Sequence, residues 1–171
     1  MSAQAVIDSL EYARAGQELR GSLPVSGLTR LQDFLYDNVG SVEFVVKGGC
    51  DDEMRPVLSL SISGRLHLQC QRCLERLDYP LQLSNTLLLV DRVENLAETA
   101  VDPDAPDCVE ASPALDVAGL IEDEILLGLP FAPRHEAGVC GYRTRGAAQD
   151  ADQTSGLSKL AELKKDWKSK R

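Results

Sequence analysis

Two long runs of alternating apolar and polar residues constrain the fold of this chain more than any other feature. In the first run the apolar residues fall on even positions from Leu58 to Cys70, with polar residues between them. In the second run they fall on odd positions from Leu77 to Leu89, interrupted by Asn85. A period of two places each set of side chains on one face of a pleated strand. Two such runs joined by about six residues predict a long antiparallel hairpin.

The segment between the runs carries Cys70 and Cys73, spaced as CxxC, at or next to the predicted hairpin tip. Pro80 lies within the second run, and because proline cannot donate to a strand ladder, we expect it at a sheet edge or a bulge. Another strand is expected from Ser41, where apolar residues alternate through Val46 until glycine and aspartate interrupt them. These patterns together predict an antiparallel sheet.

One amphipathic helix is predicted near residues 116–129, where Asp116 can cap an apolar stripe that ends before two prolines. At about 100° per residue, Glu124 lies inside this stripe, whereas Glu122 and Asp123 lie outside it. We therefore expect Glu124 to be a partly buried acid. The stripe consists of Val117, Leu120, Ile121 and Ile125.

Weaker patterns predict two more elements. Thr29 could cap a helix that contains Leu31, Phe34 and Leu35. Residues 91–113 are acidic and contain proline, so we expect a solvated excursion with a short strand near Cys108 to Ala111.

These elements predict an α+β fold. Residues 1–142 should form a single α+β domain, in which an antiparallel β-sheet with a long hairpin packs against the helix near residues 116–129. Residues 143–156 have little apolar content and should form a flexible linker. Residues 157–171 have leucines three apart, followed by Trp167, which predicts a short basic amphipathic C-terminal helix.

The charge distribution limits the partners that the chain can bind. The net charge is −9 and the isoelectric point is near 4.7, whereas affinity for phosphate comes from lysine and arginine. Residues 157–171 hold six basic and two acidic residues, a net charge of +4, so the other 156 residues carry −13. A basic tail on an acidic body could contact a polyanion that the body repels.

Within that tail, Lys164, Lys165, Trp167 and Lys168 are candidates for binding RNA or a protein groove. A cationic C-terminal helix also complements its own dipole, which is a purely structural explanation of the same residues.

The sequence also bears on the compartment. No run of about 18 apolar residues occurs, which excludes a transmembrane helix and predicts a soluble protein. The N-terminal residues lack a basic region followed by an apolar one, so we expect no secretory signal and a cytoplasmic localisation. Five cysteines at irregular spacing argue against a disulfide framework.

Three uses of the CxxC then remain. A thioredoxin-type pair relies on a helix N-terminus to lower the pKa of the attacking thiol, and here strands flank the motif. A structural zinc ion needs four ligands, and His135 with Cys140 could supply the second pair in the pattern C-x2-C-x61-H-x4-C. Free cysteines are also commonly buried as small apolar residues, which suits Cys50 and Cys108 well. Metal binding and simple burial both stay open for the set of Cys70, Cys73, His135 and Cys140.

Nothing in the sequence indicates an enzyme, since it contains no GxSxG, P-loop, GxGxxG or HExxH motif. His67 lies on the polar side of its strand, so we expect it to face solvent. The acidic run of residues 122–124 is expected to be mainly the exposed face of its helix, with Glu124 bonded to a neighbouring backbone or arginine. We therefore predict no catalytic residues.

Three segments of the chain resemble a known family. They are CQRCLE at the hairpin tip, IEDEILLGLPFAPRHEAGVC over the helix and its exit, and SGLSKLAELKK near the C-terminus. Their order and spacing resemble the YceD family, the large ribosomal RNA subunit accumulation proteins of bacteria and plastids, from about Val6 to Lys165. The resemblance places the cysteine pair of the family on Cys70 and Cys73, and the following histidine and cysteine on His135 and Cys140. It places the acidic helix motif on residues 122–124.

The resemblance implies a cytoplasmic, non-enzymatic factor for the synthesis, processing or stability of 23S rRNA, and hence for assembly of the large ribosomal subunit. Expected partners are the 23S rRNA precursor, large-subunit ribosomal proteins or other assembly factors, with no membrane and no small-molecule substrate. Arg72 and Arg76, between and beyond the cysteines, could meet phosphate or a protein carboxylate. The rival interpretation is a thiol-based redox protein that uses Cys70 and Cys73.

Overall fold

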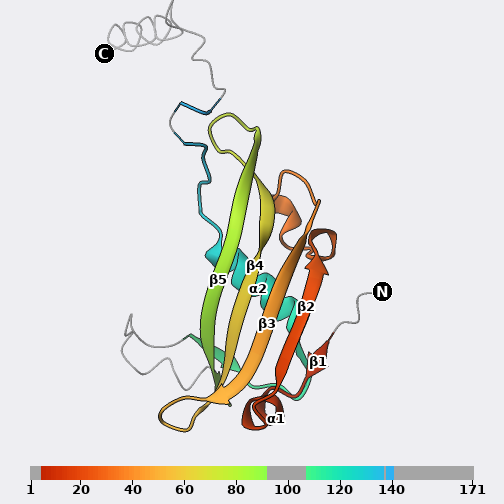
Figure 1. Ribbon diagram of the computed structural model, residues 1–171, viewed down its shortest axis with the longest axis vertical. Coiled ribbons are helices and arrows are strands. Elements are labelled where there is room, and N and C mark those ends of the chain that lie inside the picture. The colour runs from red at the N-terminus through yellow and green to blue at the C-terminus, as the bar shows by residue number, and fades with distance from the viewer. Residues whose placement is uncertain (1–4, 92–106, 137, 141–171) are drawn as a thin grey trace, which may run out of the picture. The chain divides into compact units, whose positions relative to one another are not determined.

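The structure, a computed structural model, describes residues 5–91, 107–136 and 138–140, which belong to one compact unit (Figure 1). Its strands are β1 (Val6–Ile7), β2 (Glu18–Pro24), β3 (Ser41–Cys50), β4 (Pro56–Gln69), β5 (Arg76–Val90), β6 (Cys108–Glu110) and β7 (Leu115–Asp116). Its helices are α1 (Ser9–Arg14), α2 (Val117–Gly128) and the short 3-10 helices η1 (Val25–Gly27) and η2 (Gln32–Phe34). The predicted α+β fold is confirmed. The predicted linker and C-terminal helix, residues 143–171, lie outside the described residues.

β4 and β5 form the predicted long hairpin. They pair antiparallel over thirteen residue pairs, from Val57 with Leu88 to Gln69 with Arg76. Leu58 lies opposite Leu87 in this register, so the even residues of β4 and the odd residues of β5 share one face of the sheet. The alternation therefore predicted both the pairing and the buried face correctly. The buried side chains of that face include Leu58, Leu60, Ile62, Leu66, Leu68, Leu81, Leu87 and Leu89.

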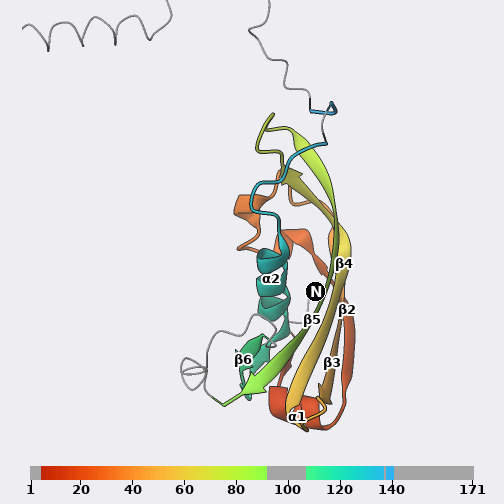
Figure 2. The same ribbon diagram turned by 90° about the vertical axis from the view of Figure 1, so that its left-hand side faces the viewer.

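One five-stranded sheet, in the order β2-β3-β4-β5-β6, carries the fold. Neighbouring strands run antiparallel except β6, which is the predicted short strand and joins β5 in parallel. α2 and the two 3-10 helices lie on the same side of the sheet (Figure 2). Ile121 and Ile125 of α2 pack with the buried face of the sheet. The core is thus a single layer of side chains between the sheet and its helices.

β5 has a neighbouring strand on both sides only at its C-terminal end. β6 pairs with Leu88–Val90, and among the described residues no strand pairs with β5 on that side before Leu88. The Leu88 N–H points to this side, where it donates to the Asp107 carbonyl at 2.8 Å. Pro80 has the same parity, so its missing N–H falls on the open edge, as expected from its chemistry.

Two carboxylates on α2 are buried, although the helical periodicity predicted only one. Asp116 caps α2 as expected, accepting from the Ala118 N–H at 3.1 Å. Glu124 is 9 % exposed, in agreement with its position in the apolar stripe. It accepts a 2.9 Å hydrogen bond from the Asn85 amide, the residue that interrupts the apolar run of β5. A buried carboxylate with a donor opposite it explains that interruption.

The expectation that Glu122 lies outside the buried face of α2 is wrong, because it is only 6 % exposed. One carboxylate oxygen accepts from the backbone N–H groups of Arg30 at 2.6 Å and Leu31 at 3.2 Å. The other accepts from Arg30 Nε at 3.0 Å. The segment before η2 covers this side of α2 and supplies the hydrogen bonds that make the burial of a charge tolerable. Asp123 is exposed, as predicted, and pairs with Arg30.

Three further expectations are also wrong. Residues 31–35 contain the short 3-10 helix η2 and no α-helix, because Leu35 leaves the turn to form an isolated bridge with Leu68 of β4. Cys50 was expected to be buried and is exposed, since it lies at the last pair of the β3–β4 ladder, opposite Pro56. Cys108, expected to be buried as well, is only partly buried.

Replacing Glu122 should test how the segment before η2 is held. Glu122→Ala leaves two backbone N–H groups without their acceptor, and we expect it to lower the free energy of unfolding by about 3 kcal/mol. Asp123→Ala removes only the exposed partner of the same Arg30 and should cost about 1 kcal/mol or less. Urea unfolding followed by circular dichroism measures both values, and equal losses would contradict this assignment.

Candidate metal centre

The tip of the β4–β5 hairpin folds Cys73 back toward Cys70. Leu74 N–H donates to the Cys70 carbonyl at 2.9 Å, and Cys70 N–H donates to the Glu75 carbonyl at 3.0 Å. Leu74 has a φ of 62°, an uncommon conformation for a residue with a branched side chain. The backbone therefore accepts local strain in order to close a turn that brings two thiols together.

The second half of the cluster comes from the segment that follows α2. Pro130 and Pro133 keep this segment out of helical conformation, and it runs along the hairpin toward the tip (Figure 2). Gln71 N–H donates to the Pro133 carbonyl at 2.8 Å, which fixes the segment to the turn between the cysteines. His135 and Cys140 are thereby placed beside Cys70 and Cys73, and their ligand atoms all lie within 4.8 Å of one another.

Two distances within the cluster match those of a tetrahedral zinc site. Zinc bonds of about 2.3 Å to sulfur and 2.0 Å to nitrogen place two sulfurs about 3.8 Å apart, and a sulfur and a nitrogen about 3.5 Å apart. Cys70 Sγ and Cys140 Sγ are 3.9 Å apart, and Cys73 Sγ and His135 Nδ1 are 3.4 Å apart. The donor set of three cysteines and one histidine is also that of structural zinc sites.

A backbone carbonyl orients His135 for this role. His135 Nε2 lies 3.0 Å from the Arg76 carbonyl oxygen, so the proton of the neutral ring is placed on Nε2. The lone pair of Nδ1 then faces Cys73. Metal-binding histidines are usually held by such a hydrogen bond from the other ring nitrogen.

The electrostatics of the turn favour a thiolate at Cys70. Burial opposes its ionisation, but N–H groups of Cys73, His135 and Arg72 outweigh that effect and hold the pKa of Cys70 at about 5. The N–H of Glu75 favours the Cys73 thiolate, yet burial and the sulfurs of Cys140 and Cys70 raise the pKa of Cys73 overall. Cys140, the Arg76 carbonyl and Cys70 raise the pKa of His135. A bound cation would relieve this accumulation of negative charge.

The same geometry is less suited to redox catalysis. A low thiol pKa alone would allow it, but a thiol that exchanges disulfides must be reached by its partner. The side chain of Cys70 is 0 % exposed, and the motif lies in a turn between two strands and not at a helix N-terminus. The cluster is therefore an arrangement that could hold a metal ion.

The other predicted site residues are not part of the Cys3His cluster. Arg72 is exposed at the hairpin tip, and Arg76 pairs with Asp78 at 3.1 Å. The candidates Lys164, Lys165, Trp167 and Lys168 lie outside the described residues.

His67 does not face solvent freely, contrary to expectation. Its side chain is 15 % exposed, and its Nδ1 lies 2.7 Å from Asp37. Tyr36 N–H donates to the His67 carbonyl at 2.7 Å, so the chain after η2 covers the ring. The sequence also gave no sign that the Pro133 carbonyl accepts from the turn between the cysteines, or that the Arg76 carbonyl orients His135. A backbone acceptor leaves no signal in residue identity.

The fold and the cluster define a class of protein: an α+β domain whose longest hairpin is closed at its tip by a Cys3His cluster. Comparison with known families matches residues 58–165 to the family described as "Large ribosomal RNA subunit accumulation protein YceD". The chain belongs to the YceD family, which is linked to accumulation of the RNA of the large ribosomal subunit. That description names no catalytic reaction.

A relative supports the assignment. The "Large ribosomal RNA subunit accumulation protein YceD" of Haemophilus influenzae is 23 % identical over 137 residues, which cover 78 % of this chain and 76 % of the relative. No solved structure matches the chain. Within the part of the chain that the structure describes, no helix is long and apolar enough to span a membrane.

Metal analysis of protein purified without chelator should find about one zinc ion per chain. Cys73→Ser and His135→Ala each remove one ligand and should lower the zinc content at least about tenfold. Cys50→Ser is the matched control, because Cys50 is exposed and outside the cluster, and it should keep the metal. Metal-free protein with a readily reversible disulfide between Cys70 and Cys73 would contradict the zinc site and support the redox interpretation.

Proposed function

We propose that the protein is a non-enzymatic factor for the synthesis, processing or stability of 23S rRNA and for assembly of the large ribosomal subunit. It acts by binding rRNA, ribosomal proteins or both. The observation that carries this proposal is the family match over residues 58–165, which spans the hairpin, the cluster and α2. The relative from Haemophilus influenzae carries the same description.

We further propose that one structural zinc ion is bound by Cys70, Cys73, His135 and Cys140. The matching distances and the outer hydrogen bond of His135 support this role. Zinc would supply no chemistry here, since four protein ligands leave it no open position for substrate. Its effect would be to hold the hairpin tip against the segment that follows α2.

The hairpin tip and the C-terminal tail are the proposed contact regions for the particle. Arg72 is exposed between two of the cluster residues and could reach a phosphate. Arg76 is partly neutralised by Asp78, so its contribution should be smaller. Residues 157–171 carry a net charge of +4, whereas the rest of the chain is acidic. RNA contact would therefore be confined to these two regions, and the body would be left for protein partners.

Sedimentation of a tagged protein through sucrose gradients at low salt tests this proposal. The wild-type protein should migrate with precursors of the large subunit and be released by ribonuclease. Arg72→Glu should reduce the bound fraction about three- to tenfold, because one phosphate contact is replaced by a repulsion. Deletion of residues 157–171 should reduce it further.

Arg14→Glu is the matched control, because Arg14 is exposed on α1, at the end of the sheet away from the hairpin tip (Figure 1). It makes the same charge change and should leave the bound fraction unaltered. Absence of the wild-type protein from large-subunit precursors at low salt would count strongly against the proposed function.

A further inference from the structure

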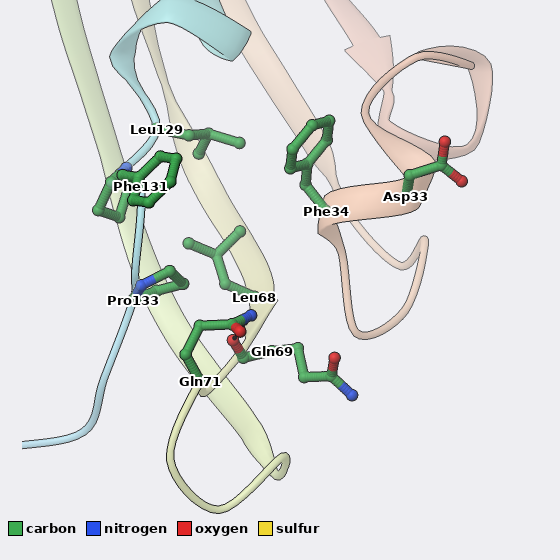
Figure 3. Close-up of a pocket in the computed structure, with 9 residues that line it drawn as sticks. Asp33, Phe34, Leu68, Gln69, Gln71, Leu129, Phe131 and Pro133 are labelled. Carbon is green, nitrogen blue, oxygen red and sulfur yellow. Dashed lines mark hydrogen bonds between the residues drawn. The ribbon is translucent and has the colours of Figure 1, made fainter. Parts of the chain in front are cut away.

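A small apolar groove lies beside the metal centre and is not explained by it. Phe34 of η2 stands on one side, and Leu129, Phe131 and Pro133 of the segment after α2 stand on the other (Figure 3). Leu68 of β4 forms the floor between them. Gln69 and Gln71 close the end toward the hairpin tip, and Asp33 lies at the rim beyond Phe34.

Two aromatic side chains of this groove are presented to water. Phe131 is fully exposed, at 106 % of its reference area, and Phe34 is 57 % exposed. A single exposed apolar residue needs no explanation, but two phenylalanines on opposite sides of one hollow form a patch. Both rings lie outside the core, whereas Leu68 on the floor between them is only 1 % exposed.

The size of the groove selects a class of occupant. Its volume is about 90 Å³. Sites for cofactors and drug-sized ligands begin at roughly 300 Å³, and a cavity that admits benzene measures about 150 Å³. The groove is therefore large enough for one aliphatic side chain of a protein partner and too small for a cofactor or a flipped base.

The polar atoms of the groove select the charge of the occupant. Among the described residues, Asp33 is the one charged residue at the groove; its carboxylate lies at the rim beyond Phe34 and makes no hydrogen bond or ion pair with any other described residue (Figure 3). The side-chain amide nitrogens of Gln69 and Gln71 each donate one hydrogen bond to a backbone carbonyl, so each amide keeps an oxygen that can accept and a second N–H that can donate. The groove thus carries a negative charge at its rim on a body that is itself acidic, which favours a cationic partner and disfavours phosphate.

We propose that this groove docks a basic segment of a large-subunit ribosomal protein. One aliphatic side chain of the segment inserts between Phe34 and Phe131, and a neighbouring lysine or arginine pairs with Asp33. The groove is thereby the protein-binding counterpart of the RNA contacts at the hairpin tip. This inference rests on the proposed function for the identity of the partner, and on the size and charge of the groove for its chemistry.

Photo-crosslinking of the full chain tests the inference. p-Benzoylphenylalanine replaces Phe131, and the protein is irradiated with proteins extracted from purified large ribosomal subunits, or separately with protein-free 23S rRNA. We expect crosslinks to ribosomal-protein segments in which an aliphatic residue lies within a few positions of lysine or arginine. Asp33→Lys and Phe34→Ser, each added to this protein, should lower the yield about tenfold.

The matched control carries the same photo-reactive residue at Leu127, which is 80 % exposed on α2 and does not line the groove. Its crosslinks should not respond to Asp33→Lys. Unchanged zinc content and unfolding temperature establish that the Phe34→Ser protein is folded, and Asp33→Lys changes only an exposed side chain.

Any of three results would overturn the inference. They are crosslinks at Phe131 that do not exceed those at Leu127, crosslinks that appear only with 23S rRNA, and crosslinks that survive Asp33→Lys. If that happens while the wild-type protein still migrates with large-subunit precursors, the groove assignment is wrong and the proposed function stands. Failure of the wild-type protein to migrate with those precursors contradicts the proposed function itself.

Discussion

The close approach of Cys70, Cys73, His135 and Cys140 is the constraint on which the functional end of this molecule depends. Beyond Gly64, and among the described residues, the two strands of the β4–β5 hairpin pair only with each other, apart from the isolated bridge between Leu68 and Leu35. A two-stranded ribbon is marginally stable in water, so the tip needs a second attachment. The cluster provides it, because His135 and Cys140 belong to the segment that leaves α2. The same attachment holds Phe131 and Pro133 beside Leu68, and so forms one wall of the apolar groove.

A buried carboxylate on α2 holds the segment that carries the other wall of the groove. Glu122 holds the backbone of Arg30 and Leu31, and that segment leads directly into η2 and Phe34. The backbone of both walls of the groove is therefore fixed by polar interactions, one by the cluster and one by a buried acid. The rigid apolar core lies below them and sets their spacing. The backbone of a docking site placed in this way would lose little conformational entropy on binding.

The sequence predicted those features that repeat along the chain. The parity of the leucines gave the hairpin and its register, the position of Pro80 gave an open edge, and the spacing of two cysteines with His135 and Cys140 gave the cluster. The burial of Glu122 could not be predicted from the sequence. The backbone N–H groups that donate to its carboxylate lie about 92 positions away and leave no periodic signal. The groove was also beyond reach, since it unites residues from η2, β4 and the exit of α2 that only the tertiary fold brings together.

The central claim is that a metal-bound cluster holds the hairpin tip to the segment after α2, and hydrogen–deuterium exchange before and after chelation tests it most directly. Removal of the metal should speed exchange in residues 69–76 and 131–140, where the Gln71 N–H bond to Pro133 would be released. Residues 58–64, paired on both sides within the sheet, should keep their protection. Identical exchange before and after chelation, or a loss of protection spread throughout β4, would contradict the account.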